Sequence, residues 1–203
     1  SFGGSGSSQD GQGVSGNGFG GGICCFNSSL ILKNIIITDN DAIKGYGYNN
    51  TNDWPGWHGF DGASFGGAIY GGNNLSTLYN DTITSNSANI GGGVVNFSGD
   101  IKNTIIFGNL NDQITSLSTP TYSCIQDWNS GGEGNISSDP KFVNAADGDF
   151  HLRENSPCID TGTTIENLLY DIDGNKRPQR NGYDIGAYEF ILRSNVRNWR
   201  GYE

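Results

Sequence analysis

Short runs of Ile, Val and Leu alternate with Gly and Asn along the first half of the chain, and this pattern recurs in register. The recurring phrases are GGGICCFNSSLILKNIIITDN at 20–40, GGAIYGGNNLSTLYNDTITSN at 66–86 and GGGVVNFSGDIKNTIIFGN at 91–109. A unit of roughly 25 residues with short β-branched runs and no 3.6-residue period is atypical of helical and leucine-rich repeats. The pattern instead predicts an all-β chain in which each phrase forms one coil of a parallel β-helix, a solenoid.

Alignment of the phrases on their glycines identifies positions that should stack. The aligned sets are Ile23, Ile69 and Val94; Asn34, Asn80 and Asn103; and Asn40, Asn86 and Asn109. Successive coils of a β-helix lie about 4.8 Å apart, so equivalent side chains form ladders. We expect the first set to point inward and the second to form a row at a bend, because Asn tolerates left-handed backbone angles. Stacked Asn amides can also hydrogen-bond to one another.

Composition and turn signals divide the chain into three regions. Residues 1–118 hold the predicted coils, which an aromatic insertion interrupts at about 41–64. Residues 119–190 have shorter apolar runs and many turn formers. We expect them to form an atypical C-terminal capping block, because an open β-helix end exposes strand edges and apolar side chains. Residues 191–203 form a basic tail, and the absence of Met from a chain that begins at Ser1 predicts a processed or truncated product.

The charge of the chain limits its partners. A net charge of −10 argues against nucleic acid and anionic lipid, which bind basic surfaces. No run reaches the ~18 apolar residues of a membrane span, so membrane insertion is not expected. A hydrophobic fraction of 34% with 33 glycines fits a solenoid, in which thin strands face the core and turns take many residues.

Four runs in the C-terminal block resemble the terminal block of bacterial right-handed parallel β-helix proteins, the choice-of-anchor Q domain group. The runs are GNISSDPKF at 134–142, GDFHLRENSPCIDTG at 148–162, DIDGNKRP at 171–178 and YDIGAYEF at 183–190. The resemblance implies a right-handed β-helix in an extracellular or cell-surface protein. Some relatives are attached to carbohydrate-active enzymes.

The cysteines do not have the spacing of a zinc site. Cys24 and Cys25 are adjacent, and Cys124 and Cys158 stand alone, so no C-x-x-C pair exists. Neighbouring residues of a strand point to opposite faces, which prevents an easy bridge between the first two. Two alternatives remain, a disulfide between Cys124 and Cys158 or buried free thiols.

The DIDGN run carries the weak metal candidate of the chain. Asp171, Asp173 and Asn175 offer hard oxygen ligands for calcium, although the run lacks the spacing of an EF-hand loop. The favoured interpretation is a turn held by the Asp side chains, paired with Arg177. No other cofactor is expected.

Strand alternation in 150–153 places Phe150 and Leu152 inward and His151 and Arg153 outward. We therefore interpret His151 as a solvated surface residue rather than a catalyst.

The aromatic insertion is the best candidate for a ligand or partner contact. Its aromatic residues are Tyr46, Tyr48, Trp54, Trp57 and Phe60. Aromatic faces beside Asn and Asp suit stacking on sugar rings, and Trp and Tyr are equally common anchors of protein interfaces. Intrachain packing against one flank of the coils is the third alternative. We expect the insertion to protrude between the first two coils.

No catalytic residues emerge from the sequence. A polysaccharide lyase needs a basic residue beside a cation, and a glycoside hydrolase needs convergent carboxylates. The coils hold only Lys33, Lys44 and Lys102 as cations, and their Asp residues are scattered among turns. The sequence therefore favours a non-enzymatic structural or adhesive domain, with a polysaccharide-binding or polysaccharide-processing domain as the alternative.

The tail provides a candidate subunit contact. Its basic and aromatic residues are Arg193, Arg197, Trp199, Arg200 and Tyr202. An acidic body in a second copy would attract such a segment. We expect head-to-tail self-assembly, in which the C-terminal region of one copy covers the open first coil of the next, or else a chain whose preceding coils were removed. The expected partners are other copies of the chain or a cell-surface polysaccharide.

Overall fold

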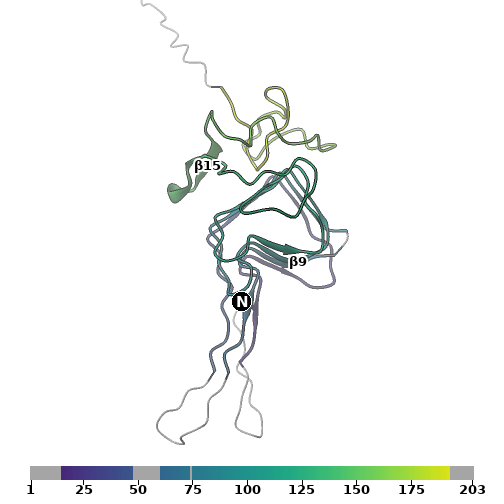
Figure 1. Ribbon diagram of the computed structural model, residues 1–203. Helices are drawn as coiled ribbons and strands as arrows, with labels where there is room; N and C mark the ends of the chain where they lie inside the picture. Colours follow the sequence, from purple (N-terminus) through teal and green to yellow (C-terminus); the bar gives the residue numbers. More distant parts are fainter. Residues whose placement is uncertain (1–14, 48–59, 74, 193–203) are drawn as a thin grey trace, which may run out of the picture.

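The computed structural model describes residues 15–47, 60–73 and 75–192 (Figure 1). These residues are almost entirely strands and turns, with one short 3-10 helix, η1 (Ala145–Asp147). Among them, no helix has the length and apolar character that crossing a membrane requires.

Three parallel sheets form the main body of the molecule. The first contains β2 (Ile23–Cys25), β6 (Ile69–Gly71), β9 (Val94–Phe97) and β12 (Ile114–Ser116). The second contains β3 (Ile31–Lys33), β7 (Thr77–Tyr79) and β10 (Asp100–Lys102). The third contains β4 (Ile36–Thr38), β8 (Thr82–Thr84), β11 (Ile105–Phe107) and β13 (Cys124–Ile125).

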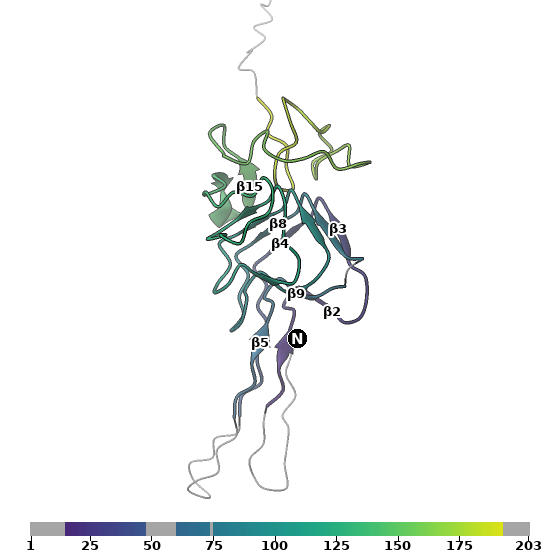
Figure 2. The ribbon, with the colours of Figure 1, turned by 45° about the vertical axis from the view of Figure 1, so that its right-hand side comes forward.

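The chain visits the three sheets in turn and then starts again. β2, β3 and β4 make up the first pass, β6, β7 and β8 the second, and β9, β10 and β11 the third. Each strand pairs with the equivalent strand of the next pass, so Ile23 lies opposite Ile69 and Ile69 opposite Val94. The predicted apolar ladder is therefore confirmed. Figure 2 shows the passes side by side.

The apolar side chains of the second and third passes are more deeply buried than the equivalent side chains of the first pass. Leu78 and Ile101, on the second and third passes, are fully buried, whereas the equivalent Leu32 of the first pass is only partly buried. The same holds for Ile23, which is partly buried beside the fully buried Ile69. The core lies between the sheets, and the first pass forms one end of it.

Two rows of asparagine follow the passes. Asn34, Asn80 and Asn103 have φ of 52°, 53° and 51°, which is the left-handed conformation that the bend requires. The second row forms a chain of side-chain bonds: the amides of Asn40, Asn86 and Asn109 donate in turn to Asn86, Asn109 and Gln113, each over 2.9 Å. Both rows were predicted from the sequence, and Gln113 extends the second.

The region around the insertion forms an arm that leads away from the sheets (Figure 2). Its paired strands are β1 (Gly18–Phe19) and β5 (Ser64–Phe65). Further out, the Ser15 amide donates to the Phe60 carbonyl over 3.0 Å, and the Gly45 amide donates to the Gly16 carbonyl over 2.9 Å. Tyr48, Trp54 and Trp57 lie outside the described residues.

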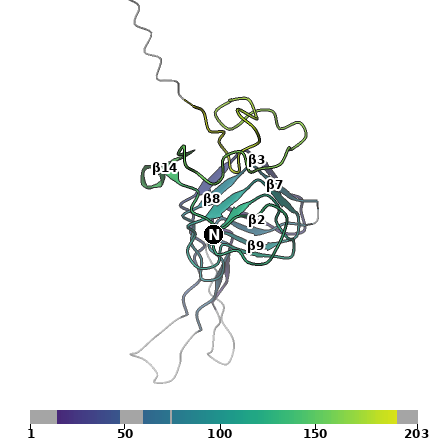
Figure 3. The ribbon, with the colours of Figure 1, turned by 45° about the horizontal axis from the view of Figure 1, so that its top comes forward.

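The C-terminal region lies differently from the predicted cap. Residues 119–136 continue from the third pass, and their Trp128 packs against the core cluster of the three sheets. Residues 137–192, which we call the side block, contain the antiparallel pair β14 (Phe142–Asn144) and β15 (Asp149–Leu152). The side block runs along the flank of the passes instead of covering an end (Figure 3). The physical reason is a set of hydrogen bonds to all three passes.

Candidate functional site

The first asparagine row is the line along which the side block binds the sheets. The Asn34 amide donates to the Tyr170 carbonyl over 2.6 Å, and the Asn80 amide donates to the Asp184 carbonyl over 3.0 Å. The Asn103 amide donates to the Thr163 carbonyl over 2.6 Å. One row of bend residues thus holds segments that are 60 to 136 positions away in sequence.

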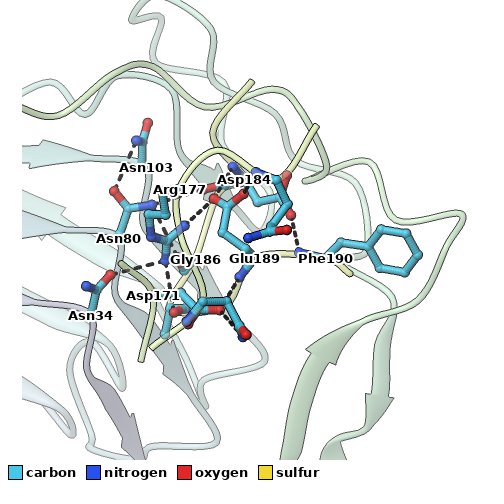
Figure 4. A network of polar contacts seen from close by, with 12 residues as sticks. Asn34, Asn80, Asn103, Asp171, Arg177, Asp184, Gly186, Glu189 and Phe190 are labelled. Carbon is cyan, nitrogen blue, oxygen red and sulfur yellow. Dashed lines mark hydrogen bonds and ion pairs between the residues drawn. The ribbon is translucent and has the colours of Figure 1, made fainter. Parts of the chain in front are cut away.

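Arg177 occupies the centre of this contact (Figure 4). Its fully buried guanidinium donates to the Glu189 carboxylate over 2.6 Å and to the Asn34 side-chain oxygen over 3.1 Å. It also donates to the carbonyls of Gly186 and Ala187, each over 2.9 Å. The sequence paired Arg177 with the DIDGN turn, and this was wrong, because Glu189 lies closer and is buried with it.

Asp171 organises the DIDGN turn. Its carboxylate accepts bonds from the backbone amides of Asp173 over 3.0 Å, Asn175 over 2.7 Å and Glu189 over 2.9 Å, and from the Asn175 side chain over 3.1 Å. These N–H donors occupy the oxygens that a calcium ion would need. No group of three or more His, Cys, Asp or Glu side chains suited to a metal ion occurs in the part of the chain that the structure describes. Asp171 and Asn175 therefore act as turn residues in this geometry.

Two buried carboxyls have strongly raised pKa values. Burial raises the pKa of Asp81 to about 8 and that of Asp184 to about 7, because desolvation disfavours the charged form. Asp81 accepts a bond from the Ile35 amide over 3.1 Å, and Asp184 accepts one from the Asp160 amide over 2.8 Å. As the pH falls through the neutral range, both carboxyls take up protons. Both lie next to the contact between the side block and the sheets.

His151 connects β15 to the DIDGN turn. Its two ring nitrogens lie 2.6 Å from Asp149 and 2.9 Å from Asp173, and its ring stacks on Tyr188 at 3.9 Å between centroids. Partial burial lowers the pKa of His151, but the hydrogen bonds to Asp173 and Asp149 prevail, and the pKa is raised overall. A histidine with both nitrogens bound to carboxylates clamps two segments together. Phe150 and Leu152 are buried and His151 is partly exposed, which confirms the predicted alternation along β15.

The aromatic rings in the described part of the insertion are exposed. Tyr46 and Phe60 are 70% and 60% exposed, and Lys44 binds Asp61 over 2.9 Å while lying over the Tyr46 ring. Intrachain packing does not bury these two rings. The remaining candidates Tyr48, Trp54 and Trp57 are outside the described residues, as are the tail residues from Arg193 to Tyr202.

A second aromatic cluster escaped the sequence analysis. Phe19, Phe26, Phe65 and Tyr70 contact one another beside β1, β2, β5 and β6, with ring centroids 4.7 to 6.2 Å apart. The pairing of β1 with β5 and of β2 with β6 brings the rings together. Phe19 and Phe65 each directly precede the aligned glycines of their repeat, and this equivalent position could have predicted the aromatic cluster.

The cysteines fall into two environments. Cys124 and Cys158 are fully buried in one apolar cluster, with their side chains in contact, and Cys24 and Cys25 lie on the first pass with partial or full exposure. All four are free thiols in the structure. The predicted bridge stays a prediction, and the structure brings its two partners together.

The first pass ends the three sheets among the described residues. Within residues 15–47, 60–73 and 75–192, β2, β3 and β4 are each the last strand of their sheet and have a strand neighbour on one side only. Phe26 and Ile31 of this pass are 57% and 65% exposed. Open edges beside apolar side chains readily accept another strand.

Comparisons with protein-family models, with curated proteins and with solved structures find no match to this chain.

Proposed function

We propose that the chain is a right-handed parallel β-helix domain of an extracellular or cell-surface protein, with a structural or adhesive role. Three parallel sheets visited in turn, with equivalent residues in register, support the β-helix. Crossovers between parallel strands are right-handed in about 98% of cases, which supports the handedness. The resemblance of residues 134–190 to choice-of-anchor Q domains supports the location.

The role in assembly rests on one observation, the open edge of the first pass. Among the described residues, three strands at this end have no further strand beside them, and the exposed apolar side chains of Ile31 and Phe26 lie on the same pass. A second copy of the chain could cover this end, because it contains strands that can pair with the open edges and apolar side chains that can pack on Ile31 and Phe26. The partner end is its C-terminal region, because a tail with three arginines complements the acidic body of a chain whose net charge is −10. Asp39 and Asp41 are exposed on the first pass and carry part of that charge.

Sedimentation velocity over a range of concentrations tests this assembly. The parent chain should form species larger than a monomer, and Ile31→Lys should reduce them, since a buried charge would oppose the contact. Leu110→Lys is the matched control, because Leu110 is 63% exposed, close to the 65% of Ile31, but follows β11 on the third pass and lies outside both proposed contact regions. Deletion of residues 193–203 should act like Ile31→Lys. A parent that stays monomeric at high concentration would contradict the proposal, and a closed dimer that survives the deletion would exclude the head-to-tail arrangement.

Polysaccharide binding is the alternative function, and the aromatic cluster with the exposed arm rings favours it. Phe26, Tyr46 and Phe60 are 57%, 70% and 60% exposed, and the ion pair of Lys44 with Asp61 offers polar groups on the arm. Such surfaces suit sugar rings. Affinity electrophoresis in gels that contain cell-wall polysaccharides tests this alternative. Retardation that Phe26→Ala and Phe60→Ala both abolish would support it, and equal mobility with and without polysaccharide would reject it.

A further inference from the structure

Cys124 and Cys158 come from different parts of the fold and meet in its interior. Cys124 belongs to β13, and its amide donates to the Thr104 carbonyl of the main body over 3.0 Å. Cys158 belongs to the side block, and its carbonyl accepts a bond from the Ile185 amide over 2.9 Å. Both side chains are fully buried and lie in hydrogen-bonding contact. The Cys124 thiol also donates to the Ser138 carbonyl of the side block over 3.2 Å, and both cysteines pack in one apolar cluster with Ile105 and Ile185. These contacts hold the two thiols close together.

The other two cysteines do not have this arrangement. Cys24 and Cys25 are neighbours on β2, where alternate residues face opposite sides, and the Cys25 thiol donates to the Ser28 carbonyl over 3.3 Å. Neither belongs to the buried cluster that contains Cys124 and Cys158. The chain thus contains one cysteine pair placed for a bond and one adjacent pair that serves as an internal control.

We propose that Cys124 and Cys158 form a disulfide that fastens the side block to the main body. The bond does not depend on self-assembly, because both cysteines are internal to one chain. Each thiol loses one proton and one electron, and the sulfurs join in one S–S bond. A small disulfide such as oxidised glutathione takes up the two electrons, its own S–S bond breaks, and two thiols form.

The environment of the pair determines when this bond forms. The hydrogen bond to Cys124 and the burial of the site raise the pKa of the Cys158 thiol well above its usual value. The thiolate is the reacting species, so the docked, reduced pair exchanges slowly. The bond therefore forms during folding, while the side block docks and before the site is fully buried, and afterwards the surrounding side chains shield it from reductants.

Peptide mapping provides the test. The full chain is refolded in a buffer of reduced and oxidised glutathione, denatured with iodoacetamide present, and digested with trypsin without reduction. Cleavage after Lys and Arg isolates Cys124 in peptide 103–141, Cys158 in peptide 154–176, and the adjacent pair in peptide 1–33. We expect peptides 103–141 and 154–176 to be joined, with peptide 1–33 alkylated. Alkylated 103–141 and 154–176, or either peptide joined to 1–33, would overturn the proposal.

A second measurement follows the shielding of the bond. The oxidised chain is exposed to dithiothreitol in native buffer and in urea below the unfolding transition, and the joined peptides are quantified over time. We expect reduction to be at least ten times slower in native buffer, because the side block must first leave the sheets. A Cys24→Ser/Cys25→Ser variant should behave like the parent, since its substitutions are remote from the bond. Equal rates in both buffers would show that the bond is exposed and would overturn the proposed shielding.

Discussion

Arg177→Ala should cause a large loss of stability. The substitution leaves the buried Glu189 carboxylate without its cation and removes the donors to Asn34, Gly186 and Ala187. Breaking a buried ion pair by removing one partner typically costs about 3–5 kcal/mol.

Urea unfolding, followed by circular dichroism at pH 7, measures this effect. The free energy of unfolding of the Arg177→Ala variant should be about 3–5 kcal/mol lower than that of the parent. Arg180→Ala is the matched control: its guanidinium is partly exposed and 3.6 Å from Asp160, so its loss should stay below about 1 kcal/mol. A loss below about 1.5 kcal/mol for Arg177→Ala would refute the reasoning.

Three further predictions concern pH, backbone shape and the second asparagine row. The pKa values of Asp81 (about 8), Asp184 (about 7) and His151 are raised in the folded state, so the folded chain holds protons that the unfolded chain has already released. The contribution of these groups to stability is therefore largest at low pH and is lost as pH rises to about 8. The melting temperature should therefore fall between pH 5 and pH 8, and Asp81→Asn should flatten this decline; a steeper decline in the variant would contradict the assignment. Gly186→Ala should destabilise the chain by about 1–3 kcal/mol, since φ is 107° and a Cβ would meet a buried side chain at 2.6 Å; thermal unfolding within error of the parent would argue against this strain. Asn86→Ala removes bonds to both neighbouring members of its row and should cost about 2–3 kcal/mol in urea unfolding, whereas a loss below about 0.5 kcal/mol would show that the row is not structural.

The repeat could be predicted from the sequence because its contacts join equivalent positions. Once the glycines are aligned, the partners of Ile69 and of Asn80 follow from the period alone, since neighbouring passes pair in register. The left-handed conformation of the Asn row followed as well, because few residues other than Gly and Asn tolerate a positive φ. Alternation along β15 likewise separated the buried Phe150 from the partly exposed His151.

The side block has no period, so its contacts required the tertiary structure. The spacing of residues around Arg177 does not distinguish Glu189 from the acidic residues of the DIDGN turn, which are nearer in sequence. Only the path of the folded chain buries Glu189 together with Arg177. The partners of Asn34 lie 136 and 143 positions away, and His151 meets Asp173 from another segment. A repeating segment encodes its neighbours in its own pattern, whereas an irregular segment finds its partners only when the folded chain brings distant residues together.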